Sequence, residues 1–357
     1  TLATVGGKPR LLASASNAVQ GIDPATGKVL WWCDAKGDTV SPVLGGGLLW
    51  AGLFIKPQPV GGTVQPPVLE RRDHYYGIAP APGGGVWVAG TGGKIVAIDA
   101  QAHARVLATP TDQTLQDIAV WDDRHAVAVG NDGVILTTAD GGQHWKAVEG
   151  VPRSTVANKL TRIRVAADGK AVATGEMGAL LHSKDYGASW SRLRDEEDVA
   201  WNDAALLPGG ALVVVGEFGR ILVSPDGGGT WLTPEVPVSS SLMAVAFRNA
   251  RDGVAVGLEG VVLSTADGGR TWQRRKQEST SHLFDIAWDE PTQGWLGVGA
   301  LGAWVKAGAP ANDWQGGRLD ERDLAWHTRI LPVGREAWLA GANIGRWDGQ
   351  RWQPIGR

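Results

Sequence analysis

The sequence predicts an all-β protein of the β-propeller class, and three observations lead to this prediction. An S/T-x-D-x-G-x-x-W motif recurs four times, alternating apolar runs joined by glycine-rich turns precede each copy, and no segment shows helical periodicity. The chain also contains 18 Trp against 3 Tyr and 4 Phe, together with 51 Gly, which suits a repeated unit rich in turns. Four-stranded units of about 40 residues are typical of propeller blades.

The four motif copies, called Asp boxes here, have a near-constant spacing. Their aspartates lie 45, 41 and 41 residues apart. The Ser or Thr and the Asp can bond local backbone amides, the Gly permits a positive φ, and the Trp folds back as an apolar anchor. We therefore expect each box to be a structural turn between the third and fourth strands of a blade. The residues concerned are Asp140, Trp145, Asp185, Trp190, Asp226, Trp231, Asp267 and Trp272.

Counting hairpins extends the repeat beyond the boxes, because nine runs look like the second strand of a blade. They end at Ser16, Gly52, Gly90, Gly130, Gly175, Gly216, Gly257, Gly299 and Gly341. Repeat units bury their faces against neighbours, so we expect one propeller domain over 1–357 with eight or nine four-stranded blades in a single ring. The alternative is seven regular blades over 73–357, with boxes within 113–277, after a less regular N-terminal extension over 1–72.

Three segments carry a family resemblance: Gly175–Trp190, Val215–Trp231 and Val256–Trp272. Their V-G-x-x-G run followed by a box resembles the blade signature of the photosystem II stability and assembly factor family (Ycf48-like), a group of Asp-box propellers. The resemblance continues in degenerate form over 278–357, with Trp314 and Trp352 at the box-Trp positions. It implies a non-enzymatic role in assembly. The first unit departs from it, because Ile22–Trp31 is similar to a quinoprotein-type blade.

Composition excludes several classes of function. The formal charge of −3 gives no general attraction for nucleic acid. The chain has no run of 18 apolar residues, so we expect no segment that inserts directly into a membrane. Cys33 is the only cysteine, and the seven histidines show no metal-binding spacing, so we expect neither a metal nor a cofactor. The chain begins with neither Met nor a signal peptide. We expect a targeting segment to have been removed and the location to be periplasmic or secreted.

An enzyme of the sialidase type is the alternative, because sialidases also contain Asp boxes. Box aspartates lie one to a blade, whereas paired glycosidase carboxylates lie within roughly 5–10 Å of each other. A sialidase also needs a Tyr nucleophile, and the one dense polar cluster is Arg71–Tyr76. We expect no catalytic residue in the boxes. A glycan-binding or glycoside-hydrolysing propeller stays open as the second function.

The expected partner site lies at the propeller mouth, on the face opposite the boxes. Alignment of the first strands of the repeats places charged residues at equivalent positions near the axis. These residues either line the channel or form a solvated docking surface. The second-to-third strand turns add acidic and apolar side chains, which could instead be tucked between blades. The predicted set is Asp117, Arg162, Asp203, Asp285, Glu176, Glu217, Phe218 and Glu259, with Met177 beside them. The predicted function is a protein-binding scaffold or assembly factor for a membrane-associated complex.

Overall fold

The computed structural model describes residues 68–70, 72–322 and 324–355, and eight strands of the chain before residue 68. The chain divides into two compact units, Thr1–Arg72 and Asp73–Arg357. No helix in the described part of the chain is long and apolar enough to cross a membrane. The helical segments described after residue 73 are five single 3₁₀ turns, in agreement with the expected all-β class.

The first unit contains two sheets, with strand orders β1-β2-β3-β4-β8 and β5-β6-β7. The strands are β1 (Leu2–Val5), β2 (Lys8–Ala15), β3 (Ala18–Ile22), β4 (Val29–Asp34), β5 (Val43–Gly45), β6 (Leu48–Trp50), β7 (Phe54–Ile55) and β8 (Gln58–Pro59). Most of the quinoprotein-like motif, from Asp23 to Lys28, lies outside the described residues.

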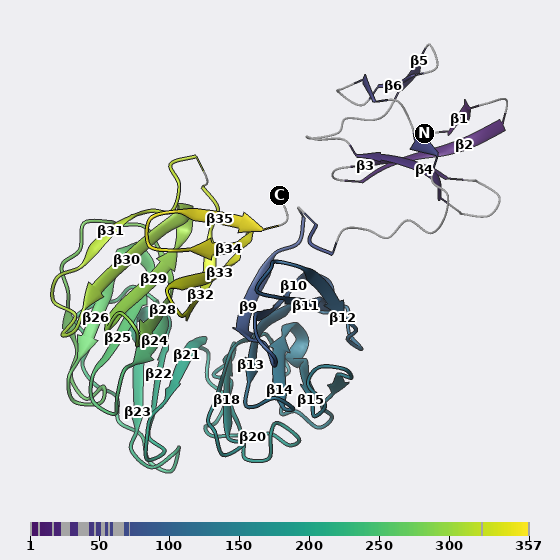
Figure 1. Ribbon diagram of the computed structural model, residues 1–357. Coiled ribbons are helices and arrows are strands. Elements are labelled where there is room, and N and C mark those ends of the chain that lie inside the picture. The colour runs from purple at the N-terminus through teal and green to yellow at the C-terminus, as the bar shows by residue number, and fades with distance from the viewer. Residues whose placement is uncertain are drawn as a thin grey trace. The chain divides into compact units, whose positions relative to one another are not determined.

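The second unit is a propeller of seven antiparallel blades, drawn from blue to yellow in Figure 1. Blade 1 is β9 (Tyr75–Pro80), β10 (Val86–Gly90), β11 (Ile95–Ile98) and β12 (Ala104–Leu107); blade 2 is β13 (Leu115–Val120), β14 (Ala126–Gly130), β15 (Ile135–Thr138) and β16 (Lys146–Ala147); blade 3 is β17 (Leu160–Val165), β18 (Ala171–Gly175), β19 (Leu180–Ser183) and β20 (Ser191–Arg192).

The remaining blades follow the same order, except that blade 4 has three strands. Blade 4 is β21 (Trp201–Leu206), β22 (Leu212–Gly216) and β23 (Ile221–Ser224); blade 5 is β24 (Leu242–Phe247), β25 (Gly253–Gly257), β26 (Val262–Thr265) and β27 (Gln273–Arg274); blade 6 is β28 (Leu283–Asp289), β29 (Gly294–Gly299), β30 (Ala303–Gly308) and β31 (Gln315–Arg318); blade 7 is β32 (His327–Val333), β33 (Glu336–Gly341), β34 (Ile344–Trp347) and β35 (Trp352–Ile355).

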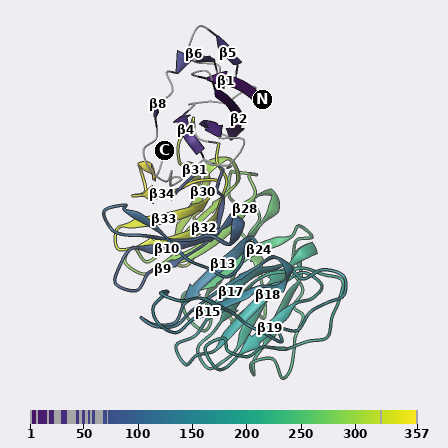
Figure 2. The same ribbon diagram turned by 90° about the vertical axis from the view of Figure 1, so that its right-hand side faces the viewer.

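The ring closes within residues 73–355, so the preferred expectation of eight or nine blades is wrong and the seven-blade alternative is the one found. Each first strand packs against the first strand of the next blade, and β32 packs against β9 to complete the circle. Figures 1 and 2 both place the yellow last blade beside the blue first blade. Hairpin counting failed because the hairpins before residue 73 have the same apolar alternation but form a five-stranded and a three-stranded sheet.

Every first strand carries a β-bulge at its second residue. The register between β17 and β18 shifts between Leu160 and Arg162, for example, so Thr161 has no partner on β18. The same shift occurs in the other six blades. In a bulge, two successive residues of one strand lie opposite a single residue of the partner strand, and the bulged strand bends. It therefore sets how side chains are presented near the axis.

Apolar layers fill the spaces between blades, and the box tryptophans belong to them. Trp145 packs with residues of blades 1 and 2, Trp190 with blades 2 and 3, and Trp272 with blades 4 and 5. These three rings are at most 8% exposed, but Trp231, between blades 3 and 4, is only partly buried. Burial of a large aromatic ring contributes several kcal/mol, so the layers hold neighbouring blades together.

Candidate functional site

The two faces of the propeller follow from the antiparallel strand order. Each second-to-third strand turn emerges beside the connection to the next blade, and each third-to-fourth turn emerges on the opposite side. The first of these sides is called the mouth face and the second the box face. The mouth-face turns are Thr91–Gly93, Asn131–Gly133, 176–179, Glu217–Gly219, Leu258–Gly260, Ala300–Gly302 and 342–343, and the connections are 108–114, 148–159, 193–200, 233–241, 275–282 and 319–322 with 324–326.

On the box face, the four predicted turns share one hydrogen-bond pattern. In blade 2, the Asp140 carboxylate accepts the Thr138 hydroxyl at 2.8 Å and the backbone N–H of His144 at 2.9 Å. The Thr138 hydroxyl in turn accepts the backbone N–H of Gly142 at 3.0 Å. Asp185, Asp226 and Asp267 make the equivalent bonds in blades 3, 4 and 5. Each carboxylate is thus occupied by donors of its own turn.

These bonds change the acidity of the box carboxylates. The N–H of His144 lowers the pKa of Asp140, and the N–H of Thr230 lowers the pKa of Asp226, because a hydrogen bond to the charged form favours that form. Burial opposes the effect at Asp185 and Asp267, but bonds from Ser189 and Thr271 outweigh it and lower both pKa values. The box carboxylates are therefore held ionised, one to a blade.

The aligned charged residues of the first strands meet at the axis. Arg162 of blade 3 reaches Asp285 of blade 6, with Nη2 and Oδ1 3.0 Å apart, and lies 3.3 Å from Asp203 of blade 4. Arg164 makes two bonds to Asp203, at 2.9 and 2.7 Å. Arg329 of blade 7 pairs with Asp117 of blade 2 at 3.0 Å. This axial cluster therefore joins blades that are not neighbours in the ring.

Each of the three aspartates of the axial cluster also ties its own blade to the following one. Asp117 accepts the backbone N–H of Ile163 at 3.1 Å, Asp203 accepts that of Val245 at 3.0 Å, and Asp285 accepts that of Ile330 at 2.9 Å. Burial alone would raise the pKa of Asp203, but the Arg162 and Arg164 guanidinium groups outweigh it and lower that pKa. Three carboxylates and three guanidinium groups thus balance within the cluster.

Burial corrects the expectation that Asp117, Arg162, Asp203 and Asp285 are solvated at the entrance. Their exposed fractions are 3%, 1%, 0% and 4%. Buried charges are retained where they are paired and hydrogen-bonded, which describes all four. The alignment placed them correctly at equivalent positions, but their contacts hold the ring together and leave them no surface for a partner.

Sequence reasoning missed two partners in the axial cluster. Arg329 occupies the same strand position as Asp117, and extending the alignment to the strand that begins at His327 would have found it. Arg164 lies two residues after Arg162, where the corresponding first strands have Ala119, Ala205, Ala246 and Ala287, and its charge is the exception at that position. In blade 1, the position equivalent to Asp117 and Arg329 is Gly77, where a Cβ atom would come within 2.6 Å of Asp117 Cα.

The predicted turn residues do lie on the mouth face, and they differ from blade to blade. Phe218 is 71% exposed and Glu259 is also exposed, while Glu176, Glu217 and Met177 are half-buried. Glu176 accepts the backbone N–H of Lys159 at 3.3 Å, and Glu217 accepts that of Ala200 at 2.8 Å. Phe218 is therefore presented to solvent on a turn that Glu217 helps to anchor, and Glu259 is exposed on the equivalent turn of blade 5.

Three of the bulge residues join neighbouring blades at the mouth, which the sequence did not reveal. Thr161 donates to the carbonyl of Trp201, Asn202 to that of Leu242, and Thr328 to that of Tyr76, each in the following blade. Where the last blade meets the first, Tyr76 stacks on Trp326 with ring centroids 5.6 Å apart. The mouth is thus lined by polar and aromatic side chains above the buried axial cluster.

Comparison with known proteins decides the family. The family model described as "Photosynthesis system II assembly factor YCF48" matches residues 96–231 and 229–282, more than half of the chain. The chain belongs to this family. No curated protein sequence matches it.

Three solved structures show the same fold as this YCF48 family member. YCF48 from Cyanidioschyzon merolae is 14% identical, with a TM-score of 0.62 over 76% of this chain and 94% of that one. A structure titled "YCF48 bound to D1 peptide" is 18% identical, with a TM-score of 0.61 over 75% and 90%. PorZ, a surface component of the type-IX secretion system of Porphyromonas gingivalis, is 13% identical, with a TM-score of 0.60 over 80% and 38%.

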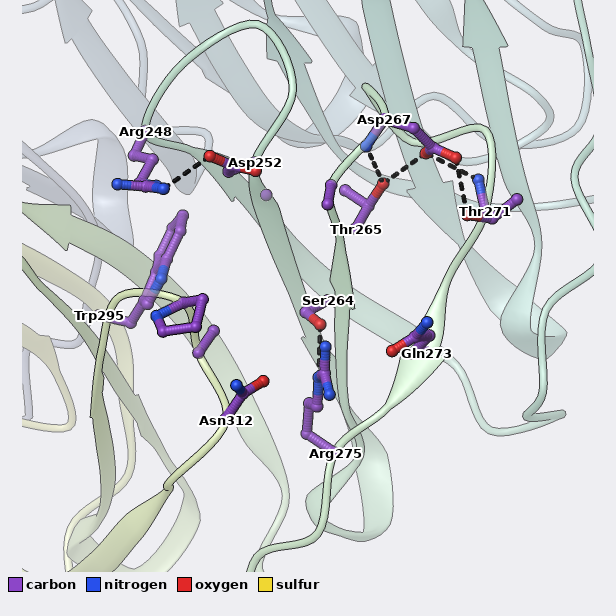
Figure 3. A pocket seen from close by; sticks show the side chains of 14 residues that line it. Arg248, Asp252, Ser264, Thr265, Asp267, Thr271, Gln273, Arg275, Trp295 and Asn312 are labelled. Atoms are coloured by element: carbon purple, nitrogen blue, oxygen red, sulfur yellow. Dashed lines mark hydrogen bonds and ion pairs between the residues drawn. The ribbon is translucent and has the colours of Figure 1, made fainter.

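The box face of this family member holds two pockets between blades. One, of about 360 Å³, lies between blades 5 and 6 (Figure 3), where Arg248 pairs with Asp252 at 2.7 Å and Arg275 donates to the Ser264 hydroxyl. The other, of about 690 Å³, lies between blades 3 and 4, where the box Trp is only partly buried, and its lining combines leucines with polar side chains such as His182 and Lys184. We assign no ligand to either pocket, because the polar groups of the first are largely paired with each other and the second is a gap in the apolar layer.

Within the described residues, the three tyrosines that could serve as a sialidase nucleophile are each held in other contacts, Tyr76 by stacking on Trp326. Tyr75 is 2% exposed and donates to Asp73 at 3.2 Å, and Tyr186 packs on His125 between blades 2 and 3. The described residues contain no group of three or more His, Cys, Asp or Glu side chains placed to hold a metal ion. Neither the family nor the similar structures support the glycan alternative.

Proposed function

We propose that this protein is a non-enzymatic assembly or accessory factor that binds a segment of another protein on its mouth face. Membership of the YCF48 family supports the assembly role. The structure titled as bound to D1 peptide gives a precedent, in a similar fold, for a peptide ligand. We extend the proposal to a partner within a membrane-associated complex, and to a periplasmic or secreted location that cell fractionation can test.

One observation supports the mouth face over the box face. Among the described residues, seven large apolar side chains are exposed by 45% or more, and four of these lie on the mouth face. They are Val156, Phe218, Leu301 and Leu324. Exposed apolar side chains on a rigid scaffold are typical of protein-binding surfaces, and turns that differ between repeats can encode one partner.

Site-specific crosslinking tests the proposal. A photoreactive phenylalanine analogue replaces Phe218 on the mouth face or, as the control, Val333, which is 45% exposed at the box-face end of β32. We expect irradiation in native membranes to join position 218, and not position 333, to one component of a membrane complex, identified by mass spectrometry. Equal crosslinking from both positions, or crosslinking from position 333 alone, would overturn the choice of face.

A further inference from the structure

The mouth-face turns hold bulky residues in a backbone conformation that usually favours glycine. Blades 2 to 6 place the middle residue of the turn in the left-handed region, with φ between 52° and 58°, whereas blade 1 has Gly92 there. The five residues are Asp132, Met177, Phe218, Glu259 and Leu301. A left-handed conformation is unfavourable for residues other than glycine, asparagine and aspartate, so all of these positions except Asp132 are strained. Such strain persists where the side chain has a use, which makes these positions candidates for contact with a ligand.

Phe218 is the most exposed of these residues, and its backbone is fixed on both sides. A Cβ atom on the following Gly219 would lie 2.2 Å from the carbonyl oxygen of Val238, so the turn sits directly against the connection to blade 5. The preceding Glu217 bonds to Ala200 in the connection from blade 3. An aromatic ring carried to solvent on a fixed backbone needs no loop rearrangement to reach a partner, and exposed aromatic side chains are typical of binding surfaces.

The charges around Phe218 are negative and not neutralised. Within the described residues, Glu176, Glu217 and Glu259 take part in no ion pair. Of the cations on the same connections and turns, Arg194 and Arg220 are already paired with Glu197, Arg220 at 2.9 Å, which leaves Lys159 and Lys276 against the three glutamates. The connection into blade 4 adds the exposed acids Asp195, Glu196 and Asp198. The surface over blades 3 to 5 therefore combines an exposed apolar anchor with a negative field.

Resting on the proposed function, we infer that this surface takes a cationic, partly apolar segment of the partner, in which lysine or arginine residues flank an apolar side chain that packs on Phe218. The flanking cations would meet Glu176, Glu217 and Glu259, and one of them could also lie over the aromatic ring. An acidic segment, a phosphorylated one or an anionic lipid surface would be repelled by the same charges.

Three fluorescent ten-residue peptides test the inference: one of lysine and leucine, one of lysine and serine, and one of glutamate and leucine. Measured by fluorescence anisotropy at 50 mM salt, the lysine–leucine peptide is expected to bind at least tenfold more tightly than either of the others. The affinity should fall as salt rises to 300 mM, because the attraction is partly electrostatic. Equal or tighter binding of the glutamate–leucine peptide would overturn the inference.

Variants locate the binding on this surface. The triple change Glu176→Gln, Glu217→Gln and Glu259→Gln keeps the hydrogen-bond acceptors but removes the charge, and should weaken binding of the lysine–leucine peptide at least tenfold. Phe218→Ser should have a similar effect. The matched box-face controls are Asp123→Asn, Asp168→Asn and Asp313→Asn together, and Val333→Ser alone; we expect changes below twofold. Controls that weaken binding as much as the mouth-face variants would show nonspecific attraction and overturn the site.

The outcomes separate this inference from the proposed function. If a partner is crosslinked from position 218 but the glutamate–leucine peptide binds more tightly, the assembly role is supported and the inference of a cationic segment is rejected. Absence of both crosslinking and peptide binding would remove both.

Discussion

The two faces of this propeller use the turns between strands in opposite ways. On the box face, the Asp and the Ser or Thr side chains turn inward and satisfy the amides of their own turn. On the mouth face, residues such as Phe218 and Leu301 occupy a left-handed backbone and extend into solvent. One face repeats because it serves stability, and the other varies because stability does not fix its side chains. Functional residues are therefore expected where a repeated turn has a side chain at a position whose backbone conformation favours glycine.

The largest effect is expected beneath the mouth face, at the axis. Arg329→Ala removes the partner of Asp117 and three bonds to backbone carbonyls. An unpaired buried carboxylate would remain, so unfolding by denaturant should show a loss of about 3–5 kcal/mol. Arg322→Ala, on an exposed connection, is the control and should change stability by less than about 0.5 kcal/mol. A loss below about 1 kcal/mol for Arg329→Ala would mean that the axial cluster does not hold the ring.

The next effect separates two box tryptophans that look alike in sequence. Trp272→Ala removes a ring that is 6% exposed and should cost about 3–5 kcal/mol of unfolding free energy. Trp231 is only partly buried against its apolar layer, so Trp231→Ala should cost about half as much. Denaturant unfolding of both variants decides this. Equal losses would show that the apolar layer between blades 3 and 4 is as well packed as the layer between blades 4 and 5.

A smaller effect depends on pH. The folded-state pKa values of Asp140, Asp185, Asp226 and Asp267 are lowered, so the boxes contribute stability that is present above the unfolded Asp pKa of about 3.9 and lost as pH falls below it. The melting temperature should therefore fall between pH 5 and pH 2.5. Asp185→Asn with Asp267→Asn should lower it at pH 7 and reduce its further fall in acid. An unchanged acid response would contradict the assignment.

The smallest effect has the opposite sign. Phe218→Asn places a residue that tolerates the left-handed region at φ 58° and removes an exposed ring, so thermal unfolding should show a gain of up to about 1 kcal/mol. Partner binding should weaken in the same variant. Val333→Asn, in extended backbone on the box face, should give no such gain. A loss of stability at position 218 would show that the ring is packed rather than presented.

The sequence could predict the parts of the structure that depend on local chemistry. The hairpins ending at Gly130, Gly175, Gly216 and Gly257 and the box turns follow from alternation and turn residues, and the structure has them at those positions. The blade count could not be predicted in this way, because membership of a ring depends on contacts between distant strands such as β32 and β9.

The axial cluster shows the same limit. Equivalence of Asp117, Arg162, Asp203 and Asp285 was visible in an alignment, but burial and pairing depend on residues more than one hundred positions away, as in the pair of Arg162 with Asp285. A charged residue in a short strand is predicted to be exposed to solvent when its ion-pair partners are not known. The exposure of Phe218 was anticipated as one of two options, and only the three-dimensional structure distinguishes them.

The closure of the ring by side chains has a topological consequence. Each blade is built from consecutive strands, so no sheet contains both ends of the propeller. The junction of the last and first blades is spanned instead by Arg329, which reaches past Gly77 to Asp117, and by the stacked Tyr76 and Trp326. Nothing in the hydrogen-bonded sheets marks this junction as the place where the chain must start. Linking residue 355 to residue 73 and opening any other connection between blades would keep every strand ladder of the propeller. The order of the blades is therefore circular, and any blade could be the first in the chain.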